Sequence, residues 1–355
     1  MKINTTTKIL VVLLTLGILF GAFASCGETA TPDVDTTEST IDTTPVDEPK
    51  ELKSIDIYFI AGQSNASGET KVKDKNAAYE FAPELEHGFK NILFSGKVDL
   101  ISYTWRKTVL GLGYKSDKTF MGPEAGFAKA LSVYYNEETG KTAAIIKIAF
   151  GGTNLLDDTT GNNQKFGGNW VSPSYAEAKG LTYSGITGGL YRRFMDTAKK
   201  QLSKLPNGFN SFNIKGLYWM QGESDREDPE GYKEAFPYFI NDLRSDLSDI
   251  VKEITGNGDD RGASNMPIFV GTISKTFNDA TESAVNVKFI NMQKTLPDVV
   301  ENVHIVDNSN YDINVLKDGG SVVVGSNKYH WNQHDILEIG KNVGDAMLDY
   351  YGGNP

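Results

Sequence analysis

Short runs of Ile, Val, Phe and Tyr recur along the chain, and between them apolar residues repeat with helical spacing. The runs predict buried strands over residues 55–61, 143–150, 214–220, 267–273 and 303–306. The helical spacing predicts helices over residues 124–135, 187–205, 231–254, 283–296 and 333–350. Continuous apolar strands that alternate with helices predict a parallel sheet with helices on both faces. We therefore predict one α/β domain over residues 51–352.

The first 50 residues have a different pattern. Lys2 and Lys8 precede an apolar run over residues 9–24 that continues into the letters FASCGE, the order typical of a secretory signal. The only cysteine, Cys26, lies at the end of this pattern and resembles the lipid-attachment cysteine of bacterial lipoproteins. An uncleaved membrane anchor is the weaker interpretation, because the run is short for a bilayer span.

We therefore predict a lipoprotein signal peptide over residues 1–25 and an exported bacterial lipoprotein, membrane-anchored in the periplasm or at the cell surface. Residues 26–50 are rich in Thr, Asp, Glu and Pro, which is typical of a flexible tether. Loss of the two signal lysines takes the formal charge from -11 to -13. This acidity disfavours nucleic acid and anionic lipid as partners, so we expect membrane contact only through the N-terminal lipid.

Polar clusters follow the first three predicted strands directly. They read GQSN (62–65), GGTN (151–154) and QGESD (221–225), and a fourth cluster, NKYHWNQH (327–334), precedes the last predicted helix. In open parallel sheets, ligands bind beyond the carboxyl ends of the strands. Four polar clusters at the same predicted edge therefore indicate a functional site.

Ser64, in the first cluster, is a candidate nucleophile. A serine hydroxyl needs a base to take its proton and an oxyanion hole to stabilise the developing charge. The small neighbours Gly62, Ala66 and Gly68 allow a tight turn that presents the hydroxyl. A polar turn serine is the alternative, and the nucleophile elbow Gly-x-Ser-x-Gly is disfavoured because Ala66 replaces its second glycine.

Four histidines are candidates for the base. His330 is favoured because it comes late in the chain, between a loop rich in Gly, Ser and Asn and the last predicted helix. His304 begins a strand at the far edge of the sheet, and His87 lies in a loop without a motif. His334 follows His330 by four residues, but no third metal ligand can be named, so no metal site is predicted.

The remaining two clusters supply donors and acceptors. The glycines of GGTN offer unhindered backbone N–H groups that suit an oxyanion, or they make an ordinary turn. Gln221 can donate through its amide and Glu223 can accept. A solvated loop before the helix near Pro229 is the alternative interpretation of this pair.

Together the four clusters, with GPEAGFAKAL in the first long helix, resemble the SGNH hydrolase superfamily over residues 55–345. They are most similar to its branch of sialate O-acetylesterase-like proteins and family 6 carbohydrate esterases. The resemblance implies a flavodoxin-like three-layer α/β/α sandwich with a central parallel sheet. It also implies hydrolysis of acetyl esters on sugars without a metal or another cofactor.

The resemblance further implies individual roles. Ser64 matches the nucleophile and contributes its N–H to the oxyanion hole. Gly152 and Gln221 match the further oxyanion donors, the first through its N–H and the second through its side-chain amide. His330 matches the base that activates Ser64 and then protonates the leaving sugar, and Asn154 is a candidate supporting residue.

One position departs from the family pattern. The family has Asp-x-x-His where this chain has Asn327 three residues before His330. Three interpretations follow. Asn327 or a backbone carbonyl orients His330 in a dyad; another carboxylate, Glu223 or Asp335, serves instead; or the protein is a weak or inactive relative that binds glycans.

The expected substrate is an acetylated carbohydrate, either sialic acid or a polysaccharide such as xylan. A segment over residues 151–185 is rich in Gly and Asn and carries Trp170, Tyr175 and Tyr183, which either stack on sugar rings or anchor the segment by packing. A glycan-binding surface lipoprotein is the alternative function. A lipase or phospholipase is disfavoured, because it would have apolar loops around the site.

Overall fold

The computed structural model describes residues 53–96, 103–115, 119–159, 161–278, 282–311, 313–316, 322–324 and 327–355. These residues belong to one compact unit, Glu51–Pro355. The predicted signal peptide, Cys26 and the tether lie outside the described residues and stay predictions. No helix in the described part of the chain is long and apolar enough to cross a membrane.

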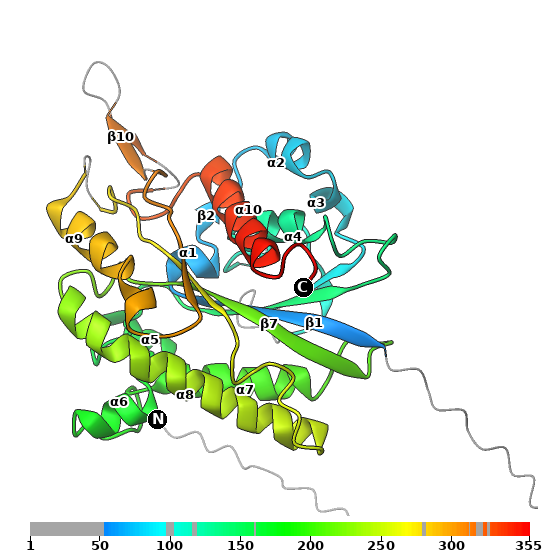
Figure 1. Ribbon diagram of the computed structural model, residues 1–355. Coiled ribbons are helices and arrows are strands. Elements are labelled where there is room, and N and C mark those ends of the chain that lie inside the picture. Colours follow the sequence, from blue (N-terminus) through cyan, green and yellow to red (C-terminus); the bar gives the residue numbers. More distant parts are fainter. Residues whose placement is uncertain are drawn as a thin grey trace, which may run out of the picture. The chain divides into compact units, whose positions relative to one another are not determined.

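A seven-stranded sheet of described residues forms the centre of the unit (Figure 1). Its strands stand in the order β4-β3-β6-β1-β7-β8-β9, and all neighbours pair in parallel except the edge strand β4. Their bounds are β1 (Ser54–Gly62), β3 (Ile92–Gly96), β4 (Arg106–Lys107), β6 (Ala143–Ala149), β7 (Ser211–Met220), β8 (Ile268–Gly271) and β9 (Val303–Val306). Two small antiparallel ladders join β2 (Thr70–Lys71) to β5 (Phe120–Met121) and β10 (Asn314–Leu316) to β11 (Val322–Val324).

Helices cover both faces of the sheet (Figure 1). One face carries α2 (Lys75–Phe81), α3 (Glu84–His87), α4 (Glu124–Leu131) and α10 (Gln333–Tyr350). The other carries α5 (Gly161–Phe166), α6 (Pro173–Ala178), α7 (Gly189–Leu202), α8 (Pro229–Thr255) and α9 (Ala284–Gln293). The short helix α1 (Ser64–Ser67) follows β1, and a 3-10 turn (Leu296–Asp298) follows α9.

The central strand β1 is buried on both faces, which explains its unbroken apolar run. Ile57 and Phe59 point into the core beneath α7 and α8. Tyr58 and Ile60, which alternate with them, point into the core beneath α4 and α10. Because side chains of a strand alternate between faces, a strand between two helical layers must be apolar at every position.

The predicted three-layer α/β architecture is confirmed, as are all five predicted strands (β1, β6, β7, β8 and β9) and all five predicted helices (α4, α7, α8, α9 and α10). Helix α4 ends at Leu131, earlier than predicted, and the chain continues in turns. The sequence pattern missed β3, β4 and the short helices. These elements are short, and such short pieces depend on tertiary contacts rather than on their own periodicity.

Candidate active site

The polar clusters after β1, β6 and β7 leave the sheet at one level. In the parallel ladders, Gly62 stands opposite Ala149 on β6 and opposite Met220 on β7. The N–H of Gln63 donates to the Met220 carbonyl (3.0 Å), and the N–H of Phe150 donates to the Gly62 carbonyl (3.1 Å). GQSN, GGTN and QGESD therefore meet at the carboxyl edge of three neighbouring strands.

Gly62 permits the turn that presents Ser64. Its φ is +137°, and a Cβ there would lie 2.0 Å from the Met220 carbonyl oxygen, so a side chain would displace β7. The chain then enters α1, whose first residue is Ser64. The first N–H groups of a helix have no acceptor within it, so the Ser64 N–H is available to a ligand.

The other end of α1 is held by a buried ion pair. Lys147 on β6 donates to the Ser67 carbonyl oxygen (3.0 Å), at the end of α1, and to the Leu112 carbonyl oxygen (2.8 Å). It also donates to Glu124 Oε2 on α4 (2.9 Å). Burial lowers the pKa of Lys147, and Glu124 opposes that shift. This ammonium fixes α1 to the sheet and to α4.

A cavity of about 520 Å³ opens beside Ser64. It is lined by Gln63, Ser64, Glu69, Tyr114, Gly151, Gly152, Asn162, Lys165, Phe166, Ser224, Phe277, Tyr329 and His330. Three predicted site residues, Ser64, Gly152 and His330, thus share one pocket. Gly152 has φ +65°, and its N–H donates to no backbone carbonyl among the described residues.

His330 is 7% exposed and is held by Asn327. Asn327 Oδ1 accepts from the backbone N–H groups of Tyr329 (2.8 Å) and His330 (3.0 Å). These bonds direct the Asn327 NH2 group to His330 Nδ1, at 2.9 Å. Because an NH2 group only donates, Nδ1 must accept and the ring proton lies on Nε2. Asn327 therefore favours the tautomer in which Nε2 cannot take a proton from Ser64.

Glu69 also faces His330, and no sequence pattern singled it out. Its Oε2 lies 3.8 Å from His330 Nε2. A Cβ built on Gly151 would lie 2.2 Å from Glu69 Oε1 and 3.3 Å from Ser64 Cβ, so the carboxyl group lies close to Ser64. Burial raises the pKa of Glu69 to about 7 against the opposing effect of two nearby lysines. Burial also lowers the pKa of His330 to about 4, so its ring is neutral near pH 7.

Gln221 lies beneath the pocket rather than on its wall. Its Nε2 donates to the Thr153 carbonyl oxygen (3.0 Å), to Asp225 Oδ2 (2.5 Å) and to Gln63 Oε1 (3.3 Å). A direct oxyanion contact would require Gln221 to exchange these bonds, so that role stays a prediction. Asn154 belongs to the same buried layer, where its Nδ2 donates to Asp225 Oδ1 (3.1 Å). Burial raises the pKa of Asp225 to about 6.

Glu223 contacts Asn65, the residue that follows Ser64. Asn65 Nδ2 donates to Glu223 Oε1 at 2.8 Å, and each of the two side chains is 1% exposed. Burial raises the pKa of Glu223 to about 7. No contact joins Glu223 to His330 among those found for the described residues, so Glu223 contacts Asn65 rather than the imidazole.

The other histidines and Asp335 lie elsewhere. His87 ends α3 and is exposed, and His304 on β9 stacks on Phe269 with ring centroids 4.9 Å apart. His334 is exposed at the start of α10 and lies 3.3 Å from Asp335. Asp335 also accepts from Asn332, so it is engaged at the helix terminus. Among the described residues, no group of three or more His, Cys, Asp or Glu is placed to hold a metal ion.

Aromatic residues do line the pocket, although they are not the tryptophan and tyrosines that the sequence suggested. Trp170 is fully buried against Trp219, and its Nε1 donates to Thr153 Oγ1 (3.1 Å). Tyr175 is buried against Tyr238. These residues therefore anchor the segment by packing. The aromatic wall of the pocket consists of Tyr114, Phe166, Phe277 and Tyr329.

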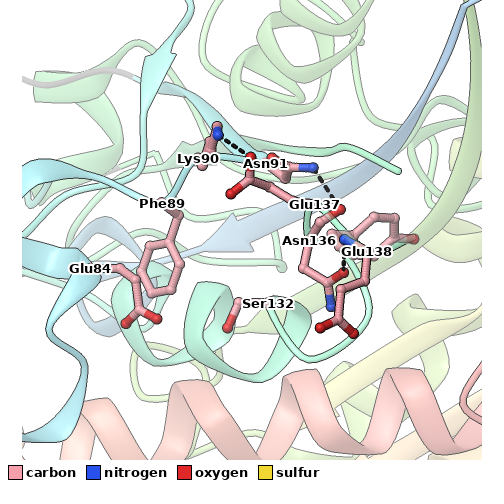
Figure 2. Close-up of a pocket in the computed structure, with 9 residues that line it drawn as sticks. Glu84, Phe89, Lys90, Asn91, Ser132, Asn136, Glu137 and Glu138 are labelled. Atoms are coloured by element: carbon pink, nitrogen blue, oxygen red, sulfur yellow. Dashed lines mark hydrogen bonds and ion pairs between the residues drawn. The ribbon is translucent and has the colours of Figure 1, made fainter. Parts of the chain in front are cut away.

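A second cavity, of about 370 Å³, lies near the opposite end of the strands, where Asn91 precedes β3 (Figure 2). Figure 2 shows Lys90 paired with Glu137 and Asn91 bonded to Asn136 across its rim. Its serine, Ser132, donates to the Lys129 carbonyl oxygen (2.8 Å). This cavity has a serine but lacks a histidine among its lining residues, so it does not compete with the pocket at Ser64.

The fold and the Ser64 pocket define an α/β protein of the SGNH hydrolase type. The chain belongs to the family of carbohydrate esterases described as sialic acid-specific acetylesterases, whose pattern matches residues 54–349. The resemblance drawn from the four clusters is thereby confirmed, and the protein is an esterase by family. No curated protein matches the chain.

Comparison with solved structures gives several that are similar to this chain. The crystal structure of NanS is 14% identical, covers 85% of this chain and 98% of its own, and has a TM-score of 0.51. A protein from Arabidopsis thaliana is 19% identical, with coverage of 83% and 98% and a TM-score of 0.45. A carbohydrate acetylesterase from Xanthomonas citri is 12% identical, with coverage of 84% and 57% and a TM-score of 0.45. At these identities, the likeness to NanS supports the fold alone.

Proposed function

We propose that the protein is a carbohydrate O-acetylesterase that uses Ser64 as its nucleophile and forms an acetyl-enzyme. The observation that carries this proposal is the shared pocket of Ser64, Gly152 and His330 at the carboxyl edge of β1 and β6. Family membership supports the same reaction class. The proposal requires no cofactor.

In the proposed reaction, Ser64 Oγ attacks the acetyl carbonyl carbon while His330 Nε2 takes the serine proton. The N–H groups of Ser64 and Gly152 face the oxygen that becomes negative. Collapse of this intermediate breaks the ester bond, and His330 returns the proton to the leaving sugar oxygen. Water then attacks the acetyl-enzyme by the same steps and releases acetate.

We further propose that turnover is slow, because Asn327 holds His330 in the unproductive tautomer. Moving the ring proton to His330 Nδ1 would place it against the Asn327 NH2 group, whose nitrogen lies 2.9 Å from Nδ1. Losing one hydrogen bond and leaving one donor unpaired costs about 1–3 kcal/mol. The productive tautomer is then populated roughly 5- to 150-fold less than the resting one.

Asn327 also favours a second candidate function, a glycan-binding surface lipoprotein with little activity. The pocket retains side chains that can bind a sugar even if His330 is a weak base. Its aromatic wall suits stacking on a sugar ring. Lys165 and Glu69 supply charges of opposite sign.

The substrate is proposed to be an acetylated sugar, either sialic acid or a polysaccharide such as xylan. Lys165 suits a sialate carboxylate, whereas Glu69 disfavours one when it is ionised. Acetate release from a panel of acetylated sialosides and xylans separates the two classes. Preference for the sialosides would assign the sialate esterase activity.

The proposed nucleophile is tested by Ser64→Ala with p-nitrophenyl acetate. We expect turnover to fall by about 10³-fold, because the nucleophile is lost while binding remains. Ser132→Ala is the matched control, since Ser132 lies in the second cavity, and it should leave the rate unchanged. Equal rates for wild type and Ser64→Ala would reject the esterase mechanism, and glycan binding by both would then favour the second function.

We also propose that the protein is an exported lipoprotein attached to a membrane through a lipid on Cys26. This proposal rests on the order of charged, apolar and small residues before the cysteine. It places an acetylated carbohydrate outside the cytoplasm as the partner, with no role for nucleic acid.

A further inference from the structure

Asn65 and Glu223 leave two oxygen atoms unpaired in a buried site. The bond from Asn65 Nδ2 to Glu223 Oε1 (2.8 Å) uses one polar atom of each side chain. The other two, Asn65 Oδ1 and Glu223 Oε2, are buried and have no hydrogen-bond partner among the described residues. Two unpaired acceptors in a buried site are costly, because each has lost its bonds to water.

A proton on Glu223 would remove this conflict. An ionised carboxylate can only accept, whereas a carboxylic acid also has one O–H donor. An amide and a carboxylic acid can then form two hydrogen bonds in opposite directions. Resting on the proposed esterase function, we propose that Glu223 is a neutral acid whose Oε2–H donates to Asn65 Oδ1, and that it positions the nucleophile Ser64.

The surroundings of Glu223 favour its neutral form. On its own loop, the carboxylate of Asp225 disfavours a second negative charge, and Arg226 opposes that effect. The hydroxyls of Tyr218 on β7 and Tyr232 on α8 also face this region, and burial keeps both phenols neutral. Burial is the largest cause of the raised pKa of Glu223, and it outweighs the opposing hydrogen bonds that the carboxyl group receives from Asn65 and from the backbone.

The pair of Asn65 and Glu223 lies next to the segments that carry Ser64 and His330. Asn65 directly follows Ser64 in the single turn of α1. Asn65 Nδ2 also lies 3.4 Å from the carbonyl oxygen of Tyr329, the residue before His330. One amide thus connects the segments that carry the nucleophile, the base and Glu223. Glu223 is a positioning residue, since it acts through Asn65.

The first experiment compares Glu223→Gln with Glu223→Ala in acetate release. The glutamine side chain introduced by Glu223→Gln can donate from Nε2 to Asn65 Oδ1 and accept at Oε1, so we expect kcat within about threefold of wild type at pH 6. Glu223→Ala removes both bonds, and we expect kcat to fall by about 10²-fold with little change in KM. Equal losses in both variants would mean that a carboxylate is needed, which would overturn the proposal.

The pH profile gives a second readout. Ionisation of Glu223 above about pH 7 removes the Oε2–H donor, so wild-type kcat should fall there. We expect this alkaline fall to be smaller in Glu223→Gln. Glu227→Gln is the matched control, because Glu227 is on the same loop and its side chain is 70% exposed. A fall of equal size in wild type and Glu223→Gln would overturn the assignment.

Infrared spectroscopy tests the proton without relying on catalysis. The wild-type minus Glu223→Gln difference spectrum at pH 6 should contain the C=O stretch of a protonated carboxylic acid, and the same comparison with Glu227→Gln should not. If Glu223→Gln does not fold, Asn65→Ala serves as the comparison instead. It keeps the acid but removes its acceptor, so the band should shift relative to wild type. Absence of the band would overturn the proposal. If the wild-type protein shows the band but has no esterase activity, only the proposed function is rejected.

Discussion

At the scale of single residues, the most consequential departure from the family pattern is Asn327. We expect Asn327→Asp to raise turnover by about 10²- to 10⁴-fold, because a carboxylate accepts the Nδ1 proton and leaves Nε2 free to take the proton of Ser64. One carboxylate oxygen can keep the bonds from the backbone N–H groups of Tyr329 and His330. Steady-state kinetics on an acetylated sugar measures the change.

Asn327→Ala is the control for this prediction, because it removes the NH2 donor without adding a charge. Its rate should rise less than that of Asn327→Asp. In wild type the pKa of His330 is about 4 because the ring is buried. A carboxylate beside the ring stabilises its charged form, so the acid limb of the pH profile should move to higher pH in Asn327→Asp. An unchanged rate would show that Asn327 does not limit the native enzyme.

Much of the site could be predicted from the sequence, in part through the family resemblance. Ser64, Gly152 and His330 each belong to a cluster next to a predictable element, and all three line the pocket. The directions of the side chains could not be predicted. The Gln221 amide, for example, donates to Asp225 beneath the pocket, and this contact forms only when the chain is folded. Glu69 was missed because it lies beyond α1 without a motif, and only folding brings it to His330.

At the scale of elements, the attachment of α1 depends on the buried pair of Lys147 and Glu124. We expect Lys147→Met to lower the free energy of unfolding by about 3–5 kcal/mol, because it leaves the Glu124 carboxylate buried without its partner. It also removes the bond to Ser67, so kcat should fall more than KM changes. Urea unfolding and steady-state kinetics measure the two effects.

The double variant Lys147→Met/Glu124→Leu separates these effects. It replaces both charges with apolar groups, so its stability should lie within about 2 kcal/mol of wild type. Its kcat should stay low, because the Ser67 carbonyl oxygen still lacks a donor. A single variant as stable as wild type would contradict the prediction.

The length and burial of each element explain whether the sequence predicts it. Strand β1 is buried on both faces, so its unbroken apolar run was sufficient to identify it. Strand β3 has only five residues and ends in Ser-Gly, and its place in the sheet depends on pairing with β6. Helix α1 has four residues, all buried, and no periodicity of its own. Such pieces are formed by the fold around them rather than by local sequence.

At the scale of the whole molecule, two buried carboxyl groups, Glu223 and Asp225, and one half-buried group, Glu69, should make the free energy of unfolding depend on pH. Burial raises the pKa of Glu69 and Glu223 to about 7 and that of Asp225 to about 6. A carboxyl group with a raised folded-state pKa stabilises the fold below its unfolded pKa, and this contribution is lost as pH rises through the folded pKa. His330 acts in the opposite direction, since its lowered pKa favours the fold as pH rises from about 4 to 6.5.

Because three groups outweigh one, the free energy of unfolding should be greater at pH 5 than at pH 8 by at least about 2 kcal/mol. Urea unfolding at the two pH values measures the difference. Glu223→Gln should reduce it, because it removes one of the three titrating groups. Greater stability at pH 8 would show that these carboxyl groups are ionised in the fold.

The N-terminal sequence predicts the cellular location of this domain. If Cys26 carries lipid, as the sequence before it predicts, the protein is attached to a membrane. We expect Cys26→Ser to abolish incorporation of labelled fatty acid and to reduce the protein in the membrane fraction. Turnover of p-nitrophenyl acetate per molecule should not change, because the ester is small and soluble. Equal fatty-acid labelling of wild type and Cys26→Ser would reject the lipid anchor.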